Sequence, residues 1–104
     1  MGTFGSRGGF SVQHTIMREI NLPIRLTKHA VEQCHERGAT EDEVREAILS
    51  GEWEEAKNGR TIAKLNVQFG KTWAGNMYPI KQVAPVFVKE AREIVVITVY
   101  TFYF

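Results

Sequence analysis

The chain of 104 residues contains one cysteine, Cys34, so it cannot form an internal disulfide bond. It also lacks an apolar run long enough to span a bilayer and a hydrophobic segment of the signal-peptide type. A formal charge of only +1 excludes a general attraction for nucleic acids or anionic membranes, so an anionic partner requires a local cationic patch. We expect a cytoplasmic protein without membrane contact.

The motifs of common nucleotide and metal sites are missing as well. The sequence has no phosphate-binding glycine loop, no pair of Cys-x-x-Cys units and no His-Glu-x-x-His. His29 and His35 would project about 240° apart around a helix, so they cannot readily share one ion. We therefore expect no metal and no cofactor.

Glycine is concentrated at the start of the chain, at Gly2, Gly5, Gly8 and Gly9. Such a composition buries little surface, so residues 1–21 are expected to be a flexible leader. Residues 22–104 are long enough for one hydrophobic core and are expected to form a single domain. Its first segment, residues 22–26, is either an edge strand or an extended lead-in.

Two helices are predicted between Thr27 and Gly51. Thr27 is a favourable N-cap residue for a helix over residues 28–37, and Gly38 lies where a left-handed C-cap residue belongs. Thr40 and Glu43 form a capping box that begins the second helix. The stripes predicted to face the core are Ala30, Val31 and Cys34 in the first helix and Val44, Ala47 and Ile48 in the second.

The hydrophobic period then changes to that of strands. Residues 53–57 and 60–69 flank Asn58-Gly59, a pair typical of a type I′ hairpin turn. Two more strands are expected over residues 81–89 and 93–104, with a loop over residues 70–79. The expected fold is α+β, with two N-terminal helices packed on a three- to four-stranded antiparallel sheet.

Two groups of polar residues on these elements are candidates for a functional site. His29, Gln33 and Arg37 follow one another at four-residue intervals along the first helix. In the last strand Thr98 and Tyr100 place hydroxyl groups on the face that alternation assigns to Ile94 and Val96. Structural roles at the helix ends and in the strand explain these residues about as well as roles in catalysis do.

Trp73, in the predicted loop, is open to two interpretations. It either covers an edge of the core, which we favour, or stacks on a nucleic-acid base.

The chain resembles an uncharacterised bacterial domain family in two stretches, His29-Ala30-x-x-Gln33-Cys34-x-Glu36-Arg37-Gly38-x-Thr40-x-x-x-Val44 and Val95-Val96-Ile97-Thr98-Val99-Tyr100. Family members read roughly His-Ala-x-x-Arg-Met in the helix, so this chain departs from them at Gln33 and Cys34. The family is similar to the RelE and BrnT toxins and to the wider barnase, EndoU, colicin and RelE group of ribonucleases. The match runs from about Ile24 to Tyr103.

The resemblance implies a metal-independent ribonuclease site where the first helix meets a curved sheet. In this site His29 would deprotonate a ribose 2′-hydroxyl that attacks the adjacent phosphorus, and Arg37 would stabilise the transition state. The expected catalytic residues are His29, Arg37, Thr98 and Tyr100, and the expected substrate-binding residues are Gln33, Glu36, Lys64 and Trp73.

Three functions follow as alternatives. The leading one is a toxin-type endoribonuclease that cleaves RNA and has a cognate antitoxin or immunity protein, either as half of a toxin pair or as the tip of a larger delivered toxin. The second is a non-catalytic module of the same fold that binds RNA or a protein. The third is a structural subunit whose aromatic end, residues 100–104, forms a homodimer interface.

Overall fold

The computed structural model describes residues 20–104, so nearly all of the expected leader, residues 1–21, lies outside the described residues. The elements follow in the order β1 (Ile24–Leu26), α1 (Lys28–Arg37), α2 (Glu41–Ser50), β2 (Glu52–Glu55), η2 (Lys57–Gly59), β3 (Thr61–Trp73), β4 (Asn76–Lys89) and β5 (Ile94–Tyr103). No helix within this part of the chain has the length and apolarity needed to cross a membrane.

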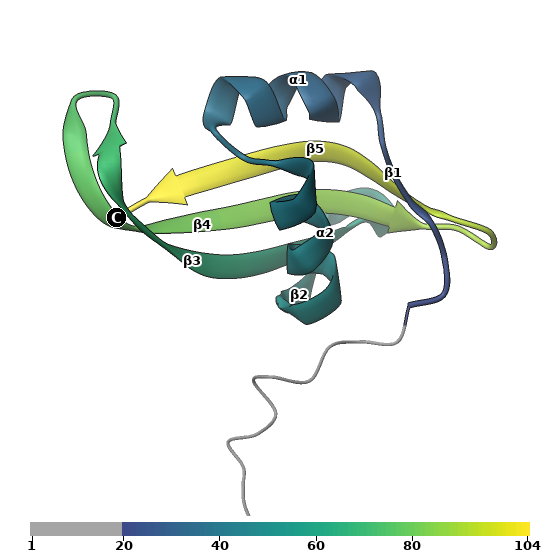
Figure 1. Cartoon of the computed structure of the whole chain (residues 1–104). Coiled ribbons are helices and arrows are strands. Elements are labelled where there is room, and N and C mark those ends of the chain that lie inside the picture. Colours follow the sequence, from purple (N-terminus) through teal and green to yellow (C-terminus); the bar gives the residue numbers. More distant parts are fainter. Residues whose placement is uncertain (1–19) are drawn as a thin grey trace, which may run out of the picture.

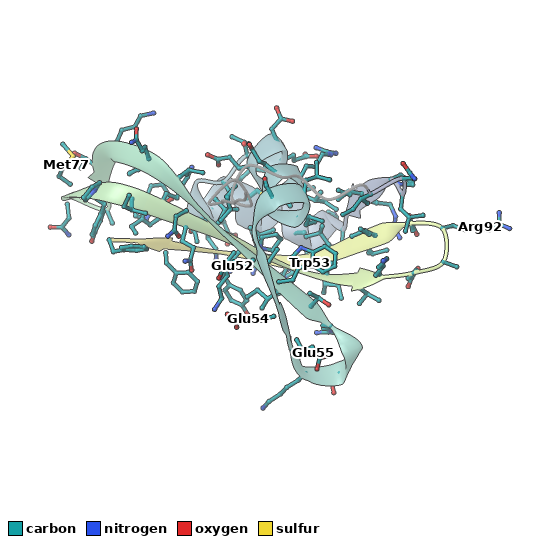
Figure 2. All side chains as sticks on the ribbon, turned by 90° about the horizontal axis from the view of Figure 1, so that it is seen from below. Glu52, Trp53, Glu54, Glu55, Met77 and Arg92 are labelled. Carbon is teal, nitrogen blue, oxygen red and sulfur yellow. The ribbon has the colours of Figure 1, made fainter. Side chains whose placement is uncertain are left out.

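The strands form one five-stranded mixed sheet in the order β1-β5-β4-β3-β2. Strand β1 is parallel to β5, and the other neighbours are antiparallel. Both helices pack on this sheet, α1 along β5 and α2 against β4 and β3 (Figure 1). Met77, at the β3–β4 turn, and Arg92, at the β4–β5 turn, lie at opposite ends of the sheet (Figure 2).

The α+β class is confirmed, but the expected three- to four-stranded antiparallel sheet is wrong. The additional strand is β1, which has only 3 residues and pairs Ile24 with Ile94. For residues 22–26 the sequence predicts either an edge strand or an extended lead-in, and the edge strand is confirmed. Three residues carry too little alternation to decide between these alternatives, and a partner so distant in the chain leaves no local signal. A short parallel strand of this kind is decided by tertiary packing.

Both predicted helices and their caps are confirmed. The Thr27 side chain accepts a hydrogen bond from the Ala30 backbone N–H at 3.1 Å, and Gly38 ends α1 with φ 77°. Thr40 and Glu43 form the reciprocal capping box, with both hydrogen bonds at 3.0 Å. The local signals were sufficient here because each cap involves residues at most five positions apart.

The core lies between the helices and the sheet. Its largest fully buried side chain is Phe87 of β4, and the indole of Trp53 meets the Phe87 ring edge-on at 5.1 Å. The Trp53 indole N–H donates to the Ile48 carbonyl at 3.0 Å, which ties β2 to α2. The other buried members are Ala30, Cys34, Val44, Ala47, Ile48, Ala63, Val83, Ile94, Val96 and Val99.

The hairpin turn predicted at Asn58-Gly59 has the expected backbone conformation. Asn58 has φ 63° and Gly59 has φ 73°, and the Arg60 N–H donates to the Lys57 carbonyl at 3.3 Å. The turn is assigned as the short 3₁₀ element η2.

The loop predicted over residues 70–79 is wrong. Strand β3 continues to Trp73 and β4 begins at Asn76, so only Ala74 and Gly75 turn the chain, both with positive φ. The sequence here contains residues typical of loops, Gly75-Asn76 and Pro79. The aromatic residues beside them nevertheless pack on one face of the hairpin. Trp73 stacks on Tyr103 at 4.8 Å with an interplanar angle of 17°.

Lys81 joins the sheet to the junction between the two helices. It is only 6% exposed, and its Nζ donates to the Gly38 carbonyl at 2.8 Å and to Glu43 at 2.9 Å. Its ammonium group also lies 5.5 Å from the centre of the Phe69 ring. A buried cation is tolerated here because all these groups favour its charge.

Gly38 is required for two separate reasons, which a pair of substitutions can distinguish. A Cβ at Gly38 would lie 2.6 Å from the Tyr103 hydroxyl and 2.8 Å from the Trp73 ring, whereas a Cβ at Gly59 would meet nothing within 4 Å. Both glycines have positive φ. We expect Gly59→Ala to reduce the free energy of unfolding by about 1 kcal/mol and Gly38→Ala by about 2 to 4 kcal/mol, measured by urea denaturation. Equal losses would show that crowding at Gly38 is relieved without cost.

Candidate functional site

Strand β5 has a partner on its outer side for only part of its length. Strand β1 pairs with residues 94–96, and beyond Val96 this edge has no neighbouring strand in the described sheet. Helix α1 runs alongside the open stretch (Figure 1). The backbone groups of an edge strand need other partners or solvent, and here α1 supplies them.

Side chains of α1 occupy the place of the missing strand. The Gln33 side-chain oxygen accepts a hydrogen bond from the Val99 N–H at 3.0 Å and another from the Thr98 hydroxyl. Arg37 donates to the Val99 carbonyl at 2.8 Å. Both backbone groups of Val99 are therefore bound by the same helix. The structure brings Gln33, Arg37 and Thr98 together at this point.

Tyr100 completes this cluster from the neighbouring position of β5. The guanidinium carbon of Arg37 lies 5.2 Å from the centre of the Tyr100 ring. Tyr100 is 42% exposed, whereas Arg37 is partly buried. Within residues 20–104, the side-chain hydrogen bonds of Arg37 go to one acceptor, the Val99 carbonyl, so further N–H groups of the guanidinium can meet an anion.

The expected sharing of a face by Thr98, Tyr100, Ile94 and Val96 is wrong. The register shifts between Val86, which pairs with Thr98, and Phe87, which pairs with Val96. This irregularity inserts one residue into β5, so Thr98 and Tyr100 fall on the opposite face from the buried Ile94 and Val96. In a continuous β-branched run nothing in the sequence marks the extra residue.

His29 lies exposed on α1, one helical turn before Gln33. The Arg37 side chain reaches back to Val99, the same residue that Gln33 contacts, so its guanidinium lies near the Gln33 amide. His29 precedes Arg37 by eight residues, about two turns or 12 Å along the helix axis, and it lies on the same side of α1. Glu36 is also exposed on α1.

Lys64 belongs to a shallow pocket on the sheet face that carries Tyr100. The pocket has a volume of about 480 Å³, and its lining residues are Ile62, Lys64, Gln82, Tyr100 and Phe102. Lys64 also pairs with Glu54 at 3.1 Å. Sequence reasoning missed Ile62, Gln82 and Phe102, although the two-residue spacing of Thr98, Tyr100 and Phe102 was a signal for the last of them.

Trp73 lies elsewhere. Its ring packs over Gly38 and stacks on Tyr103, at the C-terminal end of α1. The structure does not bring it into the Lys64 and Tyr100 pocket. This location corresponds to the interpretation in which Trp73 covers the core.

Residues 26–101 match the domain of unknown function DUF4258. The chain belongs to this family. The resemblance of the sequence to an uncharacterised domain family is thereby confirmed. The matched range includes all of α1 and residues 94–101 of β5. No curated protein and no solved structure matches the chain significantly.

Two residues next to the candidate site, Tyr103 and Cys34, have raised pKa values. Burial, partly offset by a hydrogen bond with Thr101, raises the pKa of Tyr103, so its phenol stays protonated and donates to the Arg37 carbonyl at 2.6 Å. Burial and the nearby Glu41 and Glu43 raise the pKa of the Cys34 thiol, which suits a packing residue rather than a nucleophile. Among residues 20–104 no three His, Cys, Asp or Glu side chains gather as a metal site.

Arg37 contributes to the stability of the DUF4258 domain as well as to the site. Arg37→Ala removes the hydrogen bond to a partly buried carbonyl, so we expect a loss of about 1 to 3 kcal/mol in the free energy of unfolding. Arg92→Ala is the control, because Arg92 is exposed and points into solvent at a turn (Figure 2). It should change stability by less than about 0.5 kcal/mol. Equal urea midpoints for the two variants would show that the Val99 edge is satisfied without Arg37.

Proposed function

We propose that this DUF4258 domain is a metal-independent endoribonuclease of the toxin type. The observation that carries the proposal is the fixed position of Arg37 between the Val99 carbonyl and the Tyr100 ring, on the same helix as the exposed His29 two turns earlier. A cation held in place on the same side of a helix as an accessible base suits phosphate chemistry. The helix and strand motifs resemble a domain family that is similar to the RelE and BrnT toxins, which supports the same class.

In the proposed reaction His29 takes the proton of a ribose 2′-hydroxyl. The 2′-oxygen then attacks the adjacent phosphorus, a bond forms between them, and the 5′-oxygen of the next nucleotide leaves. Arg37 stabilises the negative charge that develops on the phosphate oxygens. The Tyr100 hydroxyl positions the phosphate or protonates the leaving oxygen, whereas the Thr98 hydroxyl donates a hydrogen bond to Gln33 and so helps to hold the cluster in place. The products are a 2′,3′-cyclic phosphate and a free 5′-hydroxyl.

The surrounding contacts favour a preorganised cation. Arg37 is partly buried and is held at Val99, so little rotational freedom remains to be lost when a phosphate binds. Partial burial also strengthens its interaction with developing charge, because fewer water molecules screen it. The guanidinium supplies this charge without a metal ion.

An RNase of this type damages the RNA of any cell in which it is active. We therefore propose that an antitoxin or an immunity protein inhibits it, as the resemblance to toxins implies. The open edge of β5 and the exposed side of α1 are the surfaces that such an inhibitor has to cover in order to block His29 and Arg37.

A second candidate is an RNA- or protein-binding module without catalysis. One feature favours it: Gln33 is committed to Val99 and Thr98, and one side of Arg37 is committed to Val99. In this alternative the cluster primarily closes the edge of β5, and Tyr100 and the adjoining pocket form the binding surface.

Cleavage of RNA in the presence of a chelator tests the proposal. Purified wild-type protein should produce discrete fragments, and His29→Ala should reduce the rate by about 10² to 10⁴, the usual contribution of a general base. His35→Ala is the matched control, because His35 is also exposed on α1 but lies on a different side of the helix.

The His35 variant should cleave within about twofold of wild type, and both variants should melt at the wild-type temperature, because exposed substitutions of this kind cost little. If His29→Ala retains full activity, His29 is not the base. If folded wild-type protein leaves RNA intact, the domain is not an endoribonuclease and the binding module becomes the better explanation.

A further inference from the structure

The pocket beside Tyr100 is a groove across three strands. Its walls are Ile62 and Lys64 from β3 and Tyr100 and Phe102 from β5. Strand β4 lies between them, and the register pairs Ala84 with Tyr100 and Gln82 with Phe102. Walls two strands apart are separated by about 9.6 Å. Between them Gln82 of β4 lines the groove, whereas Ala84 is fully buried. The groove has a volume of about 480 Å³.

One wall of the groove consists of two exposed aromatic rings. Phe102 is 49% exposed and Tyr100 is 42% exposed. Their ring centres lie 6.4 Å apart and the rings are inclined by only 22°. Large apolar side chains in a row on a sheet face that no helix of residues 20–104 covers indicate a binding surface, and nearly parallel rings favour a planar ligand that stacks (Figure 1).

Cations lie on both sides of this aromatic wall. Arg37 contacts the Tyr100 ring at 5.2 Å, and Lys64 forms part of the opposite wall. The protein as a whole carries a formal charge of only +1, so this pairing of two cations with two rings is a local feature. A ligand that complements it has a flat apolar ring flanked by negative charges, which describes one nucleotide of an RNA strand.

We propose that the groove binds an unpaired nucleobase of single-stranded RNA, stacked on Tyr100 and Phe102, with its flanking phosphates on Arg37 and Lys64. Paired bases cannot enter, because in a duplex their faces are covered by neighbouring bases. Gln82 donates its amide N–H to Asn66 at 2.8 Å, which leaves its oxygen as an acceptor for an N–H group of the base. The inference rests on RNA as the substrate of the proposed ribonuclease and restricts that substrate to unpaired segments.

Binding can be measured apart from cleavage with a labelled oligouridine that carries 2′-O-methyl groups, because the proposed attack needs a free 2′-hydroxyl. Phe102→Leu keeps an apolar side chain but removes the ring, and it should weaken binding by about five- to a hundredfold in fluorescence anisotropy. Phe102→Trp should retain affinity.

Phe104→Leu is the matched control. Phe104 is 55% exposed and follows Phe102 at the next alternate position, but it does not line the groove. Its substitution should change affinity by less than about twofold. Equal affinities for wild type, Phe102→Leu and Phe104→Leu would overturn the inference.

Substitution of Glu54 tests the role of Lys64 by a change that should increase RNA affinity. Glu54 pairs with Lys64 at 3.1 Å, so Glu54→Gln releases the ammonium group and removes a negative charge near the RNA. Affinity should rise by up to about fivefold, the size of an exposed ion pair. Lys64→Gln should weaken binding and reduce the slope of log affinity against log salt by about 0.7, as expected for one lost phosphate contact. Weaker binding by Glu54→Gln would overturn the assignment of Lys64.

The same samples distinguish failure of this inference from failure of the proposed function. If wild-type protein binds the oligouridine, Phe102→Leu does not, and neither cleaves RNA, the groove is supported and the ribonuclease is refuted. If wild-type protein cleaves RNA but Phe102→Leu binds as tightly as wild type, the ribonuclease remains and the groove is refuted. If RNA does not bind and Phe102→Leu instead dissociates a dimer in sedimentation, the face is an interface between copies and the inference is overturned.

Discussion

The attachment of the C-terminal end of α1 to the sheet is the constraint on which the rest of the structure depends. A helix leaves its last carbonyl groups without partners inside the helix. Here the Arg37 carbonyl accepts hydrogen bonds from Thr101 at 2.9 Å and Tyr103 at 2.6 Å, and the Gly38 carbonyl accepts one from Lys81 at 2.8 Å. These bonds hold α1 over β5, and they require a residue without a Cβ at position 38 because Tyr103 and Trp73 lie so close.

With α1 fixed there, its side chains bind backbone groups on the open edge of β5. A bare edge invites pairing with other chains, and native proteins cover it. Gln33 and Arg37 bind both backbone groups of Val99, so the edge is closed without another strand. The same hydrogen bond orients the guanidinium against Tyr100, so edge protection and a preorganised cation come from one side chain.

The local signals predicted α1, α2 and their caps because each cap joins residues at most five positions apart. The polar spacing of Gln33 and Arg37 also placed them correctly on one track. The faces of β5 could not be predicted, because one extra residue reverses the alternation after Val96 and a β-branched run conceals it. Phe102 was missed in the site for a related reason: its role depends on Lys64 and Gln82, which lie on two other strands.

The sequence by itself determined the helices, the turn at Asn58-Gly59, the α+β class and the polar residues that α1 presents. Those properties depend on dihedral preferences and on neighbours within a few residues. Only the tertiary structure decided that β1 pairs with β5, that α1 takes the place of a strand beside Val99, and that Arg37 and Lys64 lie on either side of the Tyr100 and Phe102 rings. These properties depend on contacts between residues tens of positions apart. Strand register and packing establish such contacts, and the local sequence pattern does not predict them.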